Sequence, residues 1–185
     1  MTKRFHFTVD VDFTPGTDEG LTRILEFCVR RELPSTFFFA GRFAEKFPEL
    51  VQQVCQIGAD IGTHGWLHDD DPEESFWHPD QSKQHSLIER ATDAVEQACG
   101  IRPVLFRAPN LQLNETTIAV LEDLGYLLDY SVPSRRLSVG LQRNVPKQFF
   151  APARVYKPSR LDISREGDSS ILEVPPSSFF VPFNM

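Results

Sequence analysis

The sequence predicts an α/β protein with a parallel sheet, arranged as a distorted (β/α) barrel. Segments with the two-residue period of strands alternate about five times with segments of helical period, which is typical of parallel strands joined by helical crossovers. Polar side chains come directly after several predicted strands. Because the carboxyl ends of barrel strands face one mouth, we expect these side chains to meet there. The 185 residues are enough for one domain with its own core, over 1–185.

The first predicted strand covers residues 5–12 and carries two carboxylates at its end. Apolar and polar side chains alternate along it, so Asp10 and Asp12 lie on the same face. Two like charges this close repel each other unless a cation or a shared proton lies between them. The strand therefore indicates a cation site or a proton-sharing site.

The remaining elements follow from apolar spacing and from Gly, Pro and capping residues. Asn114 is an expected N-cap, and Gly100 is an expected helix stop. Beyond Val132 the prolines predict loops and short irregular strands. The expected elements in chain order are a helix from Asp18 to Pro34, a strand at 36–40, one helix from Phe43 to Cys55, a strand at 59–62, a helix at 79–99, a strand at 104–106, a helix after Asn114, and strands at 126–130 and 171–174.

Composition excludes several classes of protein. The net charge is −7 and there is no run of Lys and Arg, so we expect no nucleic-acid partner. No apolar run approaches the length of a membrane span, and no signal-peptide pattern follows Lys3 and Arg4. Cys28, Cys55 and Cys99 lack the spacing of a disulfide framework, which favours a reducing, cytoplasmic compartment.

Two histidines follow the strand at 59–62. His64 and His68 are four residues apart, and Gly65 between them excludes an HExxH protease motif, which needs Glu there. Alone the pair is weak evidence for a metal site. Together with Asp12 it supplies three ligands, the number that a catalytic zinc site uses while one position stays open.

Three motifs occur in register along the chain. They are the Asp pair that ends the first strand, His64-Gly65-Trp66-Leu67-His68, and Arg107-Ala108-Pro109. In order and separation they resemble the polysaccharide deacetylase family (NodB homology, carbohydrate esterase family 4). The resemblance spans roughly residues 5–131 and implies that family's distorted barrel. Its commoner first motif has adjacent carboxylates, whereas Val11 separates them here, as in the branch that resembles cyclic-imide hydrolases and some peptidoglycan deacetylases.

The resemblance implies a role for each motif residue. Asp12, His64 and His68 would bind a divalent metal, Zn²⁺ first, with Co²⁺ or Ni²⁺ as alternatives. Asp10 would be the base that activates water, and Arg107 would keep it ionised. The substrate would be an N-acetylated sugar or polysaccharide precursor. Further implied positions are Trp66, Pro109 and Tyr130 for substrate binding, and Asp129 or Glu173 as the counter-charge of Arg107.

The sequence departs from the family pattern at the histidine loop and at the C-terminal end of the barrel. Gly65 replaces the usual Ser or Thr, so a hydroxyl that would steady the histidine loop is missing. The family's last motif, a Leu and a His after a late strand, is absent, since no histidine follows His85. We therefore expect the C-terminal closing segment of the barrel to be missing. An open end would expose apolar surface, so pairing with another chain is an alternative.

Three other functions remain open at the level of sequence. A cyclic-imide or ureide hydrolase would use the same chemistry. A phosphatase of the haloacid dehalogenase type would explain Asp10-Val11-Asp12-Phe13-Thr14 but would leave His64 and His68 without a role. A non-catalytic sugar-binding module would account for the missing last motif, although it would have no use for Asp10.

Overall fold

The structure is a computed structural model that describes residues 6–67, 80–134 and 150–177. Its main feature is a sheet of six parallel strands whose spatial order is their order in the chain. This order does not reverse, as it would in a doubly wound sheet, and it confirms the predicted parallel, barrel-like class. The strands are β1 (Phe7–Val11), β2 (Ser35–Phe39), β3 (Asp60–Thr63), β4 (Leu105–Phe106), β5 (Leu128–Asp129) and β8 (Leu172–Glu173).

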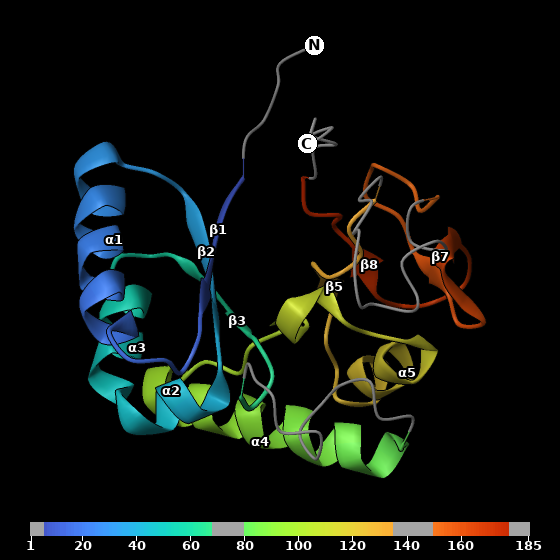
Figure 1. The fold of residues 1–185 in the computed structure, drawn as a ribbon, viewed down its shortest axis with the longest axis horizontal. Helices are drawn as coiled ribbons and strands as arrows, with labels where there is room; N and C mark the ends of the chain where they lie inside the picture. The colour runs from blue at the N-terminus through green and yellow to red at the C-terminus, as the bar shows by residue number, and fades with distance from the viewer. Residues whose placement is uncertain (1–5, 68–79, 135–149, 178–185) are drawn as a thin grey trace, which may run out of the picture.

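The helices lie along the outside of this sheet. In Figure 1, α1 and α3 flank it on the left, α2 and α4 run below it, and α5 lies to the right. The bounds are α1 Thr17–Arg31, α2 Gly41–Lys46, α3 Pro48–Gln56, α4 Gln81–Cys99 and α5 Glu115–Asp123. The three Phe side chains of β2, at positions 37, 38 and 39, are fully buried, because this strand is covered on both faces.

Local signals place several helix ends where the sequence predicts them. Gly100 follows α4 with a left-handed backbone (φ 74°), a conformation that glycine adopts without strain. Asn114 begins α5 in a capping box, where its side chain accepts the Thr117 N–H and the Thr117 hydroxyl accepts the Asn114 N–H. These ends depend on local chemistry and are confirmed.

The predicted single helix from Phe43 to Cys55 is wrong. The structure has two helices, α2 and α3, separated at Phe47, whose backbone is non-helical (φ −130°, ψ 55°). The physical reason is Pro48, which disfavours a helical conformation at the residue before it and is itself well suited to the first turn of a new helix. Apolar spacing continued across the break and concealed it.

The part of the chain beyond β5 contributes a hairpin and the last sheet strand. The strands β6 (Pro158–Ser159) and β7 (Asp162–Glu166) pair antiparallel, and β7 contacts α5. Tyr156 forms an isolated bridge with Glu173 of β8. The three cysteines are free thiols. Within the described ranges, none of the helices combines the length and apolar character needed to cross a bilayer.

Candidate functional site

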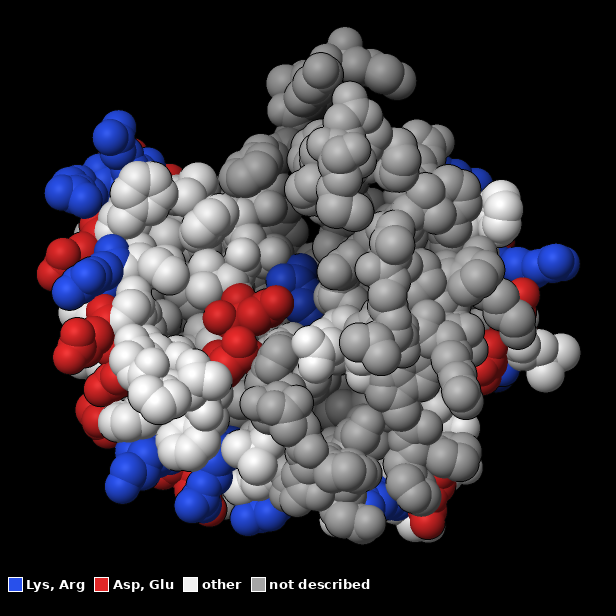
Figure 2. Space-filling model, in the orientation of Figure 1, with Lys and Arg blue, Asp and Glu red and all other residues white. Residues whose placement is uncertain are grey.

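An ion pair between distant motifs lies at the carboxyl ends of the strands. Arg107 directly follows β4, and its Nη1 donates to Asp10 Oδ1 at 2.7 Å, although the residues are 97 positions apart in the chain. The Arg107 side chain is buried (7% exposed), whereas that of Asp10 is 37% exposed. The guanidinium therefore fixes a carboxylate that solvent and a substrate can still reach. Acidic and basic side chains also meet in the hollow near the middle of the face in Figure 2.

The guanidinium of Arg107 is held on several sides. Its Nε donates to the backbone oxygen of Tyr130 at 3.2 Å. Its plane lies over the ring of Phe38, with 4.5 Å between Cζ and the ring centroid, which adds a cation–π attraction in a desolvated setting. These contacts orient Arg107 toward Asp10. The sequence analysis expected Arg107 to act on Asp10, and this contact is present, whereas the ion pairs of the described residues join Arg107 to neither Asp129 nor Glu173.

A second pair lies beside the first, between the end of β1 and the end of β3. His64 Nδ1 is 2.8 Å from the backbone oxygen of Arg107, and since a carbonyl can only accept, Nδ1 carries the proton. In the neutral ring the other nitrogen, Nε2, has a lone pair, and it lies 3.5 Å from Asp12 Oδ1. A backbone carbonyl that orients the ring in this way is the usual support of a metal-binding histidine.

The separation of these two atoms fits a shared cation. With zinc–ligand distances of about 2.0–2.2 Å and tetrahedral angles, two ligand atoms should be about 3.4 Å apart. The observed 3.5 Å between His64 Nε2 and Asp12 Oδ1 agrees with this value. The third expected ligand, His68, lies outside the described residues. Within the described ranges, no group of three His, Cys, Asp or Glu side chains is close enough to hold a metal ion.

The loop that carries His64 is tied to the start of α2. Gly65 has a left-handed backbone (φ 68°), which favours glycine at this position. Its carbonyl accepts the Gly41 N–H at 2.8 Å, and the Trp66 carbonyl accepts the Arg42 N–H at 3.0 Å. These N–H groups belong to the first turn of α2, where no helical partner is available. Backbone hydrogen bonds thus steady the loop without the missing hydroxyl.

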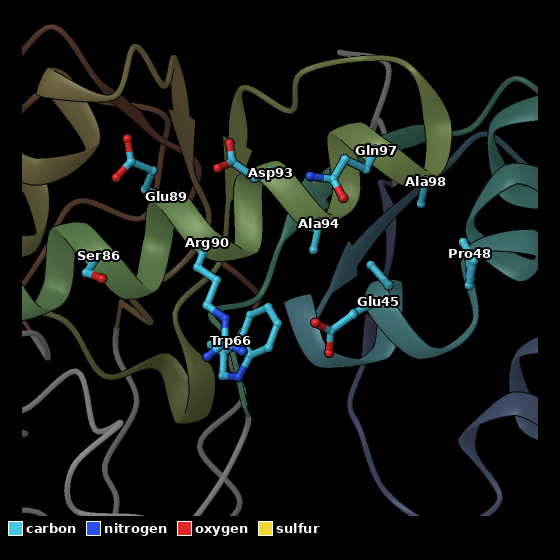
Figure 3. Close-up of a pocket in the computed structure, with 11 residues that line it drawn as sticks. Glu45, Pro48, Trp66, Ser86, Glu89, Arg90, Asp93, Ala94, Gln97 and Ala98 are labelled. Carbon is cyan, nitrogen blue, oxygen red and sulfur yellow. The ribbon is translucent and has the colours of Figure 1, made fainter.

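Trp66 lies away from the two ion pairs. Its side chain is almost fully buried (4% exposed), and the Arg90 guanidinium of α4 lies 3.5 Å above its ring. Figure 3 shows both side chains in a pocket of about 540 Å³ between α2, α3 and α4, together with Glu45 and Asp93. The ring therefore packs the histidine loop against the helices. This placement argues against the predicted substrate contact.

The other two predicted substrate positions are also buried. Pro109 lies in a short 3₁₀ turn, Pro109–Leu111, that follows Arg107. The ring of Tyr130 packs against Phe38, with 5.1 Å between centroids, and is 6% exposed. Both residues support Arg107 and its loop, and neither presents an open face for a sugar ring.

Asp129 and Glu173 lie deeper than the ion pairs. They face each other in register on β5 and β8, and both are fully buried. Burial raises the pKa of both carboxyl groups, and that of Glu173 lies well above its ordinary value, since the adjacent Asp129 adds a like charge. The prediction that they support the site is consistent with this position, although neither pairs directly with Arg107.

Two features of the site escaped the sequence analysis. Phe38 was read only as part of a buried strand, yet its ring carries the Arg107 guanidinium. Phe13 follows Asp12 and is 38% exposed, with the Arg42 guanidinium 5.9 Å from its ring centroid. Its position next to Asp12 was the available signal, and it places an aromatic ring at the mouth.

Comparisons with known proteins agree with this geometry. The sequence matches the polysaccharide deacetylase family over residues 3–128. A peptidoglycan deacetylase-like protein of Gibberella zeae is 31% identical over 115 residues, which make up 61% of this chain and 32% of that protein. The chain thus spans about a third of this relative.

Solved structures show the same fold. A Mycobacterium smegmatis protein assigned to the polysaccharide deacetylases has a TM-score of 0.69 at 24% identity, covering 97% of this chain and 63% of that one. A family 4 carbohydrate esterase of Streptomyces lividans, in complex with acetate, has a TM-score of 0.57 at 26% identity, covering 68% and 60%. By its motifs, strand order and family match, the chain belongs to the polysaccharide deacetylase family.

Proposed function

We propose that this chain removes the N-acetyl group from an amino sugar in a polysaccharide or its precursor. The observation that carries the proposal is the Asp10–Arg107 ion pair at 2.7 Å beside the Asp12–His64 pair at 3.5 Å. The first pair offers a reachable carboxylate base, and the second offers metal ligands. The relatives named as peptidoglycan deacetylases and the esterase solved with acetate support the substrate class.

A divalent metal is part of this proposal. Asp12 and His64 would hold it, with His68 as the third ligand expected from sequence spacing, and Zn²⁺ is favoured over Co²⁺ or Ni²⁺ by the imidazole and carboxylate donors. When bound, such an ion supplies Lewis-acid polarisation of a carbonyl oxygen. The proton on His64 Nδ1, held by the Arg107 carbonyl, keeps Nε2 available as a ligand.

The carboxylate of Asp10 has the position of a general base. It is exposed enough to contact a water molecule, and its Oδ1 forms the ion pair with Arg107. A base must be within hydrogen-bond reach of the proton that it takes. Arg107 would hold Asp10 in that orientation, and the Phe38 ring and the Tyr130 carbonyl would hold Arg107.

Acetate release tests the reaction. The purified chain, supplied with zinc, should release acetate from N-acetylglucosamine oligomers or peptidoglycan fragments. Asp10→Asn should lower kcat by roughly 10²–10⁴-fold, the usual contribution of a positioned base, while zinc content stays unchanged. If the wild-type chain binds zinc and the sugar but releases no acetate, the non-catalytic binding module is the better description.

Metal analysis tests the ligands separately. The wild-type chain should bind about one equivalent of zinc, which is the stoichiometry of a single catalytic site. Asp12→Ala and His64→Ala should each lose it. His85→Ala is a matched control, because His85 lies on α4 and pairs with Glu89 and Asp123 away from the site. Unchanged zinc in His64→Ala would refute the ligand assignment.

A cyclic imide or ureide is the second candidate substrate. It stays open because Val11, a buried residue, separates Asp10 from Asp12, as in the branch that includes both cyclic-imide hydrolases and some peptidoglycan deacetylases. Hydrolysis of succinimide or hydantoin, assayed beside the N-acetyl sugars, distinguishes the two. A kcat/KM for the ring that exceeds that for every N-acetyl sugar would replace the sugar proposal.

A further inference from the structure

Two buried carboxyl groups lie behind the site and have no role in the proposed chemistry. Asp129 and Glu173 are opposite each other on β5 and β8, and neither is exposed. Asp129 Oδ1 accepts a short hydrogen bond from the Ser131 hydroxyl, and Glu173 Oε1 accepts the Val132 N–H at 3.0 Å. One oxygen of each carboxyl group therefore accepts a hydrogen bond.

The second oxygens, Asp129 Oδ2 and Glu173 Oε2, are buried without a hydrogen bond to any other described group. Two ionised carboxylates in such a place would repel each other and lose their hydration. A single proton between them removes both problems. Burial raises both pKa values, while hydrogen bonds from Glu173 and Ser131 and the charge of Arg107 lower that of Asp129. The proton therefore belongs on Glu173.

A chain of hydrogen bonds connects this pair to the site. The Ser131 oxygen that donates to Asp129 also accepts the Ala108 N–H at 2.7 Å. Ala108 adjoins Arg107, whose carbonyl accepts His64 Nδ1–H and whose Nε donates to the Tyr130 carbonyl. The backbone after β5 is thus fastened to the backbone after β4, which supports both Arg107 and His64.

We propose that Asp129 and Glu173 share one proton and act together as positioning residues that hold Arg107 and His64 in place. The proposal rests on the hydrolytic function proposed above, since it states what keeps that site aligned. Loss of the shared proton would leave two buried negative charges side by side, and their repulsion would separate β5 from β8 at the level of the Arg107 loop.

Arg107, Tyr130 and Tyr156 face the pair from the neighbouring elements. Arg107, after β4, supplies the nearby positive charge, and Tyr130 lies between Asp129 and Ser131 on the chain. Tyr156 lies on the opposite side, with its backbone paired to that of Glu173, and its pKa is raised by burial and by Glu173. The two tyrosines are neutral at neutral pH, so among the described residues Arg107 supplies the positive charge that acts on Asp129.

The first test detects the proton itself and needs no substrate. At neutral pH the wild-type chain should show the infrared carbonyl band of a protonated carboxyl group. Glu173→Gln should remove this band, while Glu166→Gln, on the exposed hairpin, should leave it unchanged. If the wild-type chain shows no such band, or if Glu173→Gln leaves it in place, the shared proton is refuted.

The second test compares two replacements of Glu173. Glu173→Gln keeps a hydrogen-bond donor toward Asp129 and should keep kcat near the wild-type value. Glu173→Leu cannot donate, and should lower kcat by about 10- to 100-fold, as is usual for groups that orient metal ligands, with little change in KM. Equal losses in both variants, or a loss confined to KM, would contradict a positioning role.

The pH profile separates this role from a merely structural one. In the wild-type chain kcat should fall on the alkaline side as Glu173 loses its proton, and Glu173→Gln should lack that fall. This comparison of the wild type with Glu173→Gln still tests the positioning role if Glu173→Leu does not fold. If the wild-type chain releases no acetate, the proposed deacetylase function is refuted. The shared proton is tested separately, because the infrared measurement needs no substrate.

Discussion

Two glycines in this chain have opposite surroundings, although each belongs to a helix. Gly41 begins α2, and a Cβ placed there would lie 2.6 Å from Trp66 Cε3 and 2.7 Å from Ala91 Cα. Gly20 lies inside α1, where a Cβ would meet nothing within 4 Å. The close approach of α2, α4 and the histidine loop therefore depends on the missing side chain at position 41.

Alanine at each position should change stability in opposite directions. Gly41→Ala should lower the free energy of unfolding by about 1–3 kcal/mol, because backbone and a large ring must move. Gly20→Ala should raise it by about 0.5–1 kcal/mol through helix propensity. In thermal unfolding, each kcal/mol corresponds to about 2–4 °C in Tm for a chain of this size. A Gly41→Ala variant as stable as the wild type would contradict the packing described here.

The hairpin formed by β6 and β7 is fastened to α5 through one acidic side chain. Arg160 donates to both oxygens of Glu122, at 2.8 Å and 2.9 Å, and the Ser170 hydroxyl donates to the same carboxylate at 3.0 Å. The hydrogen bonds from Arg160 are the largest cause that lowers the pKa of Glu122 to about 2. This element thus has a polar anchor in addition to Ile163 of β7, which is buried in the apolar core beside α5.

Removing the charge of Glu122 should loosen the hairpin. Its pKa is lower in the folded chain than in the unfolded chain, so its contribution is present above the ordinary value of 4.5 and is lost as the pH falls toward 2. At pH 7, Glu122→Gln should cost about 1 kcal/mol, a modest value because Arg160 is half-exposed.

Urea unfolding from pH 7 to pH 2 measures this effect. The stability difference between Glu122→Gln and the wild type should shrink as the pH falls through the acidic range. Asp168→Asn is the matched control, since Asp168 binds the same arginine but is largely exposed, and it should leave stability unchanged. A pH-independent difference for Glu122→Gln would show that packing and not charge is responsible.

At the scale of the whole molecule, the sheet of the described residues has two outer strands, β1 and β8, at its ends. The site extends across strands from β1 through β4, and the buried carboxyl pair joins β5 to β8. Glu173 therefore belongs to a contact between two strands that are neighbours in the sheet but distant in the sequence. Whether the chain pairs with a second copy along these edges stays a prediction.

The buried acid should give the folded chain a characteristic dependence on pH. Because the pKa of Glu173 is higher in the folded chain than its ordinary value of 4.5, its stabilising contribution is complete below 4.5 and is lost as the pH rises toward the folded value. Glu173→Gln has no such loss. The free energy of unfolding of this variant should therefore rise relative to the wild type as the pH increases above 4.5, as measured by urea unfolding. A constant difference would contradict the raised pKa.

Much of the site could be predicted from sequence because its chemistry is local. The two-residue period of β1 puts Asp10 and Asp12 on one face, and strand ends place His64 and Arg107 at the same mouth. Capping signals at Asn114 and Gly100 act within a few residues of themselves. The alternation of strands and helices was sufficient for the parallel class of the fold.

Other features depend on contacts between segments that are distant in the chain, and only the tertiary structure decided them. The direction of the Trp66 ring depends on how α2 and α4 pack around it. The position of the Phe38 ring beneath the Arg107 guanidinium depends on where β2 and β4 lie in the sheet. The pairing of Asp129 with Glu173 requires the register of β5 against β8. The sequence by itself determined which groups this protein brings to its site, and the tertiary structure determined which of them touch, because pairing across strands depends on register and packing that no local pattern encodes.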